Sequence, residues 1–389
     1  MKLPVYLDFN ATTPVDSRVL ARMMPFFGEH FGNASSVAHA FGWAAAESVK
    51  VAREEVADIL SATPTEIVFT SGATESINMA IKGVAECYRR KGRQIVTVAT
   101  EHSAVLGACR ALERKGFILT YLPVDANGCV SVETVAKALT DETILVAVMW
   151  ANNETGVIQP IAEIGEVVRS HGVLFLCDAT QAVGKVPVSV EQVDLMACSA
   201  HKFYGPKGVG ALYIRRRNPR VRLVPLLDGG SQENRLRGST LNVPGIVGMG
   251  AAAALARAEV AADRARLAPL RDRMEQAFMK SLPGVRINGN GARRLPQTAN
   301  VTFTGTRAAN LMTALRDLAL SAGSACATGS TNPSHVLKAL GLSNEDAAAT
   351  LRLSMGRFTT AEDVDYATVK VIEAVRKLRR EPHAEAKPA

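Results

Sequence analysis

Residues 66–77 read EIVFTSGATESI, and this stretch gives the first indication of the fold class. Its apolar first half predicts a short strand over Glu66–Thr70, the glycine that follows predicts a turn, and a helix is expected to begin directly after it. Strands that alternate with helices indicate an α/β fold with a mostly parallel sheet. The same alternation extends to strands predicted at Gln94–Ala99, Thr143–Trp150 and Val173–Cys177, and to a helix predicted over Ala45–Leu60.

The composition of the chain excludes several classes of protein. With 389 residues, 47% of them apolar, the chain can bury a large core and is neither disordered nor fibrous. Its net charge of +8 is mild for this length and does not demand a nucleic-acid partner. No apolar run reaches the roughly 18 residues of a membrane span, and the N-terminus lacks the apolar stretch of a signal peptide. Six cysteines without a CxxC pair indicate a reducing, cytoplasmic setting.

The length predicts two domains. A shift in composition near Val247 leads into an Ala-, Arg- and Glu-rich stretch, residues 250–278, which we expect to be a long helix that is broken or kinked near Pro269. We therefore expect a large domain over residues 14–255. The smaller C-terminal α+β domain is expected to consist of residues 256–389 together with residues 1–13. The last helix is expected to start at Thr360, which resembles a capping box with Asp363.

Two strand ends carry groups that suit a phosphorylated ring. The turn after Thr70 exposes backbone N–H groups at a helix start beside Ala73 and the Thr74 hydroxyl, which suits a phosphate, although an ordinary capped turn has the same pattern. Asp178 follows an apolar strand at the sheet edge where α/β proteins bind ligands. Its carboxylate could keep a heterocyclic nitrogen protonated, with Gln181 within reach, but an Asp that caps the next helix is an equal alternative.

Lysine and cysteine nucleophiles are expected on two loops. Residues 199–210, SAHKFYGPKGVG, hold Lys202 and Lys207, and either could form a Schiff base if apolar neighbours lower its pKa. A solvated loop with ordinary lysines is the alternative. Residues 320–333, LSAGSACATGSTNP, hold Cys326, which could act as a nucleophile if its thiolate is stabilised. Cys177 and Cys198 fit inert, small apolar residues.

Three further side chains complete the candidate site. Asn153 in WANNETG can donate to a ring oxygen or a carboxylate, and Arg352 could clamp a carboxylate, unless it is an ordinary surface strand residue. His102, after the strand at Gln94–Ala99, could stack on a flat ring or move a proton. A phosphate site, an acid for a ring nitrogen and a Schiff-base lysine together describe a site for pyridoxal phosphate (PLP). No metal site is expected.

Long segments of the chain match one known family in order. They read FGNASSVAHAFGW, VFTSGATESIN, TEHSAVL, NNETGVIQPI, DATQAVGK, HKFYGPKGVGALY and SAGSACATG. In these segments the chain resembles the NifS/IscS-type cysteine desulfurases, which are PLP enzymes of fold type I, and the resemblance extends from YLDFNATTPVD to LRLSMGRFTT. It implies a mostly parallel central sheet with helices on both faces, a smaller C-terminal domain and a homodimer.

The resemblance also implies a role for each matching residue. Lys202 would bind PLP covalently, Asp178 would pair with its ring nitrogen, Gln181 would contact the ring hydroxyl, and His102 would stack on the ring and help to move protons. The phosphate would be bound by Ala73, Thr74, Ser199 and His201, and by Thr240 from the second subunit. Asn153 and Arg352 would hold the substrate carboxylate, and Cys326 would accept the sulfur.

The implied activity is the conversion of L-cysteine to L-alanine, with the sulfur held as a persulfide on Cys326. An acceptor protein, such as an iron–sulfur scaffold or a tRNA-thiolation relay protein, would then take the sulfur. The arginines between Arg215 and Arg222 would help to dock an acidic acceptor. A selenocysteine lyase or an aminotransferase of the same fold is the nearest alternative, although an aminotransferase needs no Cys326. An inactive scaffold protein and a nucleic-acid binder are the alternatives from other classes.

Overall fold

The strand, turn and helix at residues 66–77 are present in the computed structural model, which describes residues 3–322 and 333–380. Strand β2 (Ile67–Thr70) ends two residues before helix α3 (Ala73–Tyr88). Gly72 joins them with a φ of +155°, a backbone conformation that residues with a side chain rarely adopt. Glycine at this position therefore lets the strand turn directly into the helix.

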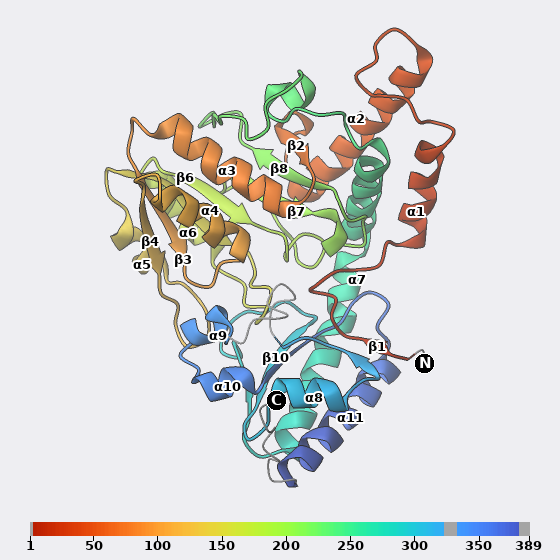
Figure 1. Cartoon of the computed structure of the whole chain (residues 1–389), viewed down its shortest axis with the longest axis vertical. Coiled ribbons are helices and arrows are strands. Elements are labelled where there is room, and N and C mark those ends of the chain that lie inside the picture. Colours follow the sequence, from red (N-terminus) through yellow and green to blue (C-terminus); the bar gives the residue numbers. More distant parts are fainter. Residues whose placement is uncertain (1–2, 323–332, 381–389) are drawn as a thin grey trace, which may run out of the picture.

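A seven-stranded sheet forms the larger part of the structure (Figure 1). Its strands lie in the order β2-β8-β7-β6-β5-β3-β4. Strand β8 is antiparallel to both of its neighbours, and the other pairs are parallel, which confirms the predicted mostly parallel sheet. The predicted strands correspond to β2, β3 (Gln94–Val98), β5 (Thr143–Met149) and β6 (Leu174–Asp178), and the others are β4 (Ile118–Leu122), β7 (Leu195–Ser199) and β8 (Gly210–Ile214).

Helices cover both faces of this sheet because alternate strand residues point to opposite sides. On one face, α3 and α4 (Ser103–Glu113) pack on residues such as Ile95, Leu145 and Leu176. On the other face, Val96, Val146 and Phe175 pack under a second group of helices. This group consists of α1 (Ser17–Met23), α2 (Ala40–Leu60), α5 (Val132–Ala138), α6 (Ile161–Ser170) and the first part of α7 (Val243–Ser281).

Helix α7 continues through Pro269, so a break at this residue is wrong, while a kink there stays a prediction. Pro269 is exposed, while Leu267, Met274 and Phe278 on the same helix are buried in the second core, and this packing outweighs the local cost of the proline. By length and composition α7 could cross a membrane, but 56% of its apolar window is buried inside the fold, as in a core helix. The proposed domain boundary at residues 255–256 falls within this helix.

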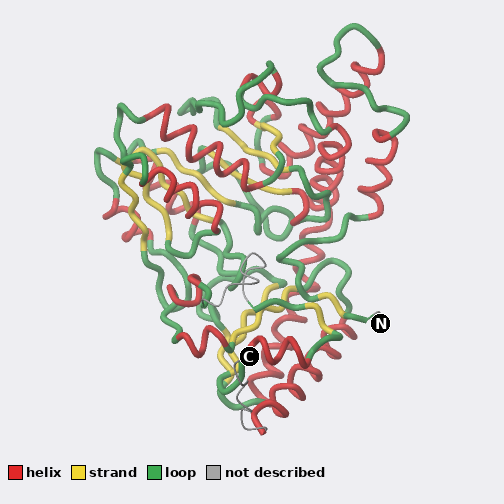
Figure 2. Tube along the Cα trace, in the orientation of Figure 1, coloured by secondary structure: helices red, strands yellow, loops and turns green. Residues whose placement is uncertain are grey.

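The lower end of α7 packs against a smaller antiparallel sheet in the C-terminal part of the chain (Figure 2). This sheet has the order β12-β10-β9, with β9 (Val285–Ile287), β10 (Thr298–Phe303) and β12 (Thr350–Ser354). Its helices are α8 (Ala308–Ala314), α9 (His335–Ala339), α10 (Asn344–Ala348) and α11 (Ala361–Arg380). The predicted capping box before α11 is confirmed, because Thr360 N–H donates to Asp363 and Asp363 N–H donates to the Thr360 hydroxyl, at 3.0 and 3.1 Å.

The N-terminal segment connects the two sheets. Strand β1 (Val5–Tyr6) pairs in parallel with β11 (Leu318–Ala319), and the Asp8 backbone bridges to Ser354 of β12. The chain then crosses to the large sheet, where Thr13 N–H donates to the carbonyl of His201 at 2.9 Å. Residues 8–13 are therefore held between the two sheets, beside the cavity described next.

Candidate active site

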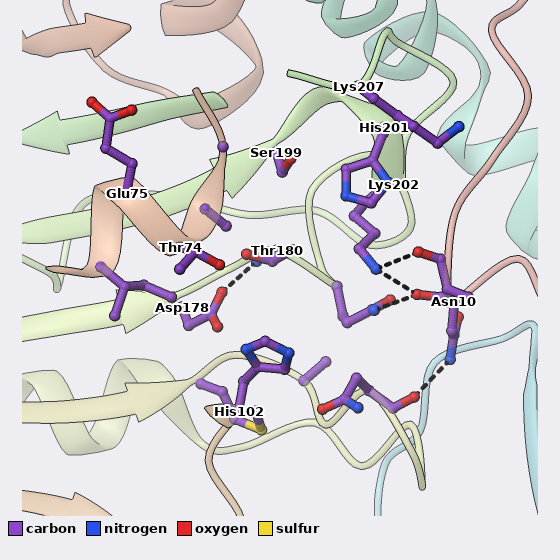
Figure 3. A pocket seen from close by; sticks show the side chains of 18 of the residues that line it. Asn10, Thr74, Glu75, His102, Asp178, Thr180, Ser199, His201, Lys202 and Lys207 are labelled. Carbon is purple, nitrogen blue, oxygen red and sulfur yellow. Dashed lines mark hydrogen bonds between the residues drawn. The ribbon is translucent and has the colours of Figure 1, made fainter. Parts of the chain in front are cut away.

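A cavity of about 430 Å³ opens at the carboxyl ends of the parallel strands (Figure 3). Asp178 ends β6, Ser199 ends β7 and Met149 ends β5, and all three line the cavity together with the start of α3. This volume is typical of a site for a small organic molecule. The sequence-predicted residues that line it are Ala73, Thr74, His102, Asn153, Asp178, Gln181, Ser199, His201, Lys202 and Arg352.

One end of the cavity suits an anion. The first residue before α3, Gly72, provides no side-chain cap, so backbone N–H groups of the first turn remain available near Thr74. Ser199 is buried beside them, and the Nδ1 atom of His201 lies 3.0 Å from the Thr12 hydroxyl. Burial, together with nearby positive charges of which Lys202 is first, lowers the pKa of His201 to about 4. His201 is therefore an uncharged hydrogen-bonding group at neutral pH.

The middle of the cavity holds an acid and an imidazole. The Asp178 carboxylate accepts the N–H of Thr180 at 3.0 Å, and Figure 3 shows it between Thr74 and His102. His102 accepts the N–H of Ala104 through Nδ1 at 3.2 Å, which leaves the proton of the neutral ring on Nε2. Burial lowers the pKa of His102, while the charge of Asp178 opposes this shift. The imidazole is therefore neutral and able to accept a proton.

The two candidate Schiff-base lysines, Lys202 and Lys207, have different positions in the structure. The amine of Lys202 lies inside the site and donates to the carbonyl oxygens of Asn10 and Ala11, at 2.8 and 2.7 Å. Lys207 lines the same cavity but is exposed at its rim. Gln181 is buried and also donates to the Asn10 carbonyl, at 2.9 Å. Lys202 is thus the lysine whose position is fixed by surrounding groups.

The other end of the cavity suits a carboxylate. Arg352 is 1% exposed, so the alternative of an ordinary surface arginine is wrong. Its guanidinium donates to the carbonyl oxygen of Asn153 at 2.9 Å and pairs with Asp8 at 2.6 Å. Its Nε atom is buried and has no partner among the residues that the structure describes. A carboxylate in the cavity would supply the acceptor that this N–H group lacks.

One predicted residue does not line this cavity, and another lies outside the described residues. Thr240 is exposed and is not among the residues that line it. Cys326 lies outside the described residues. The described residues on either side of the cysteine segment are attached beside the cavity, because Ser321 pairs through its backbone with Arg352 and the His335 ring lies 3.0 Å from the Glu101 carbonyl.

Comparison with known proteins identifies the family. The model of the family described as aminotransferase class-V matches residues 5–367. The chain belongs to the class-V aminotransferases. Among curated relatives of this class-V aminotransferase, the cysteine desulfurase IscS of Anaeromyxobacter sp. (strain Fw109-5) is 53% identical over 381 residues, which cover 97% of this chain and 94% of the relative.

Solved structures agree with this assignment to the class-V aminotransferases. A structure titled NifS-like protein superposes with a TM-score of 0.89 at 40% identity, covering 96% of this chain and 99% of that chain. A structure titled SspA in complex with cysteine gives a TM-score of 0.80 at 39% identity, covering 91% of this chain and 99% of that chain. These likenesses confirm the fold type I architecture predicted from the sequence.

Sequence reasoning missed several polar residues of this class-V aminotransferase. Asp8 and Asn10 reach the site from the N-terminal segment, and the buried Thr180 hydroxyl lines the cavity with no partner among the described residues. Glu101 is fully buried, and burial raises its pKa well above the usual range, with the Asp178 charge adding to the effect. For Asp8 and Asn10 the available signal was the run DFNATT, residues 8–13, which lacks the periodicity of an element.

The arginines between Arg215 and Arg222 have different environments. Arg215 is largely buried and pairs with Asp194 at 2.9 Å, so its role is structural. Arg216, Arg220 and Arg222 line a second cavity, of about 470 Å³, beside Cys87. The docking of an acidic acceptor protein by Arg216, Arg220 and Arg222 stays a prediction. Arg215 is no longer included in that prediction.

Proposed function

We propose that this protein is a cysteine desulfurase that converts L-cysteine to L-alanine and passes the sulfur to Cys326. The observation that carries the proposal is one cavity that holds Asp178, Lys202 and Arg352 together. An acid, an amine and a carboxylate clamp are what a PLP enzyme needs to act on an amino acid. The relatives with the name cysteine desulfurase support L-cysteine as that amino acid.

The residues present fit PLP as the cofactor. The uncapped start of α3, Ser199 and His201 would hold the phosphate, and the unpartnered Thr180 hydroxyl is a buried donor that a polar ligand would satisfy. Asp178 would pair with the ring nitrogen, Gln181 would contact the ring hydroxyl, and His102 would lie against the ring. Lys202 would bind the cofactor covalently. When bound, PLP supplies an electron-withdrawing ring that stabilises negative charge at the carbon that loses its proton.

The protein's own groups then have distinct tasks. Arg352 and Asn153 bind the substrate carboxylate and so fix the orientation of the α-carbon. Asp178 keeps a proton at the ring nitrogen, which is a stable arrangement because an ionised acid favours a cationic neighbour. The Lys202 amine removes the α-proton, and neutral His102 is available to move a proton beside it.

The transfer of sulfur to Cys326 needs no oxidant or reductant besides the enzyme and L-cysteine. The Cys326 thiolate attacks the substrate sulfur, the S–S bond of a persulfide forms, and the carbon–sulfur bond of the substrate breaks. The electron pair of that bond stays with the carbon, which takes up a proton, and the product is L-alanine. An acceptor protein's thiolate then attacks the outer sulfur of the Cys326 persulfide, the S–S bond to Cys326 breaks, and Cys326 returns to a thiolate. The acceptor carries the sulfur to iron–sulfur cluster assembly or tRNA thiolation.

Assembly and location belong to the same proposal. Exposure of Thr240, away from the cavity of its own chain, supports a homodimer in which Thr240 reaches the phosphate of the other subunit. The cysteines in the described part of the chain are free thiols, which supports a cytoplasmic location.

The test is turnover of L-cysteine by the purified protein with PLP and a reductant, with alanine and sulfide quantified together. Wild type should form both in equal amounts, and Cys326→Ala should form neither. Cys87→Ala is the matched control because Cys87 is an exposed thiol outside the active-site cavity, and it should keep wild-type turnover. Alanine formation that persists in Cys326→Ala would instead indicate a lyase, for which selenocysteine is the substrate to try next.

A further inference from the structure

Asn10 is a fully buried polar residue that contacts the amine end of the active site. It is 1% exposed, and its backbone carbonyl accepts hydrogen bonds from both Lys202 and Gln181 (Figure 3). Two donors on one carbonyl fix the direction from which the Lys202 amine approaches the cavity. The position of this carbonyl, together with that of the adjacent Ala11 carbonyl, therefore sets the position of the amine.

The side chain of Asn10 contacts the carboxylate end of the same site. Its Nδ2 atom donates to the Asn153 carbonyl at 3.3 Å and to the Thr298 hydroxyl at 2.9 Å. The same Asn153 carbonyl accepts a hydrogen bond from Arg352 at 2.9 Å. Asn10 and Arg352 thus share one acceptor, and a shift of Asn10 would move the group that orients the guanidinium.

The remaining polar atoms of Asn10 are also engaged. Its N–H donates to the Ser354 hydroxyl at 3.0 Å, and its Oδ1 atom accepts from Gln297 and Lys185 at 3.4 and 3.5 Å. Burial lowers the pKa of Lys185 well below its ordinary value, and the charges of Lys202 and Arg352 lower it further. The lowered pKa reduces the positive charge that Lys185 brings to the site while it donates to Asn10.

We propose that Asn10 is a positioning residue that holds the Lys202 amine at a fixed spacing from the Asn153–Arg352 carboxylate site. The inference rests on the desulfurase function proposed above. An amino acid presents its α-amino group, α-proton and carboxylate on one carbon, so the amine and the guanidinium must be placed relative to each other. Asn10 is the residue that bonds to both sides, through its main chain to one and its side chain to the other.

The experiment compares Asn10→Ala with Asn288→Ala in the PLP-loaded enzyme. Asn288 is the matched control because it is also buried and donates to Asn300 and Thr302, but it does not line the cavity. Affinity for L-alanine, measured by the change in visible absorbance, should fall about tenfold in Asn10→Ala, the effect of losing one hydrogen bond. With L-cysteine, KM should rise and kcat should fall, so that kcat/KM drops by roughly 100-fold. Asn288→Ala should leave these values unchanged.

The outcomes separate this inference from the proposed function. Wild type that forms no alanine from L-cysteine contradicts the desulfurase assignment. Active wild type with unaltered L-alanine affinity and kcat/KM in Asn10→Ala contradicts the role of Asn10, as does an equal loss in Asn288→Ala. If circular dichroism shows that Asn10→Ala does not fold, Asn10→Asp replaces it. This variant keeps the shape and the acceptor that faces Lys185, and it should still lose L-alanine affinity because it cannot donate to Asn153.

Discussion

At the scale of single residues, the cavity is a cationic site that contains uncharged histidines. Lys202, Lys207 and Arg352 all line it, and burial together with these lysines lowers the pKa of His201 to about 4 from an ordinary value of 6.5. The phosphate of a bound cofactor would be balanced by these cations, while His201 contributes a hydrogen bond. The cost of keeping His201 uncharged is a dependence of stability on pH.

The sign of this dependence follows from proton binding. The unfolded chain takes up the proton of His201 near pH 6.5, whereas the folded chain takes it up only near pH 4, so acid favours unfolding. We expect the thermal midpoint of the apo-protein to fall between pH 7 and pH 5, and to fall less in His201→Gln. His30→Gln, at an exposed position, should behave as wild type. Equal falls in wild type and His201→Gln would contradict the assignment.

The site residues that sequence reasoning found all occupy places with a local signal. Asp178 ends an apolar strand, Thr74 follows a glycine turn, and Lys202 lies in a Gly/Pro-rich loop, so each could be predicted from its neighbours. Asn10 could not, because its burial depends on Ser354 and Thr298, which lie about 300 residues away in sequence. Long-range packing of a segment without periodicity leaves no local pattern to detect.

At the scale of elements, helix α7 shows where a local rule fails. The sequence predicts a break or a kink at Pro269, yet the helix continues without a break because residues on both sides of it are packed into cores. The strands and α2 were predictable because their apolar periodicity and their tertiary packing agree. At Pro269 the local preference and the packing disagree, and packing determines the result.

This disagreement predicts a stabilising substitution. Pro269 is exposed and lies inside the helix, where it lacks the N–H group of the helical ladder. We expect Pro269→Ala to raise the free energy of unfolding by about 1 kcal/mol, a fraction of the full helix cost of proline. Pro64→Ala is the control, since Pro64 begins a short 3₁₀ helix, where proline is favourable. A lower thermal midpoint for Pro269→Ala would show that proline supports the shape of α7.

At the scale of the whole molecule, one arginine joins the parts that surround the site. Arg357 follows β12 and pairs with Asp16 before α1 at 3.2 Å, and with Glu259 and Asp263 of α7 at 3.1 Å. Its guanidinium also lies 4.5 Å from the centre of the Tyr204 ring. Hydrogen bonds from Arg18, with a smaller one from Arg357, hold the pKa of Asp16 well below its usual range. This cluster links the N-terminal segment, the large sheet and the smaller sheet.

Removal of this link should destabilise the fold as a unit. Asp16 is buried and the Arg357 side chain is 9% exposed, so Arg357→Met removes a largely desolvated cation from the acidic cluster. Because Arg18 still pairs with Asp16, the free energy of unfolding should fall by about 2 kcal/mol. Arg89→Met, which removes an exposed pair with Glu86, should cost less than about 1 kcal/mol. Urea unfolding followed by tryptophan fluorescence and circular dichroism measures both. Equal effects of the two variants would show that the Arg357 cluster is only a surface network.

The path of the N-terminal segment also has a consequence for biosynthesis. Val5 pairs with Leu318, Asp8 with Arg352, and Asn10 with Ser354. Residues 5–10 therefore wait for the synthesis of residues 318–354 before they reach their final places. Contacts so distant along the chain form slowly. A nascent chain can complete its large sheet once residue 214 has been made, but it gains Arg352, and with it the means to hold an amino acid, only much later.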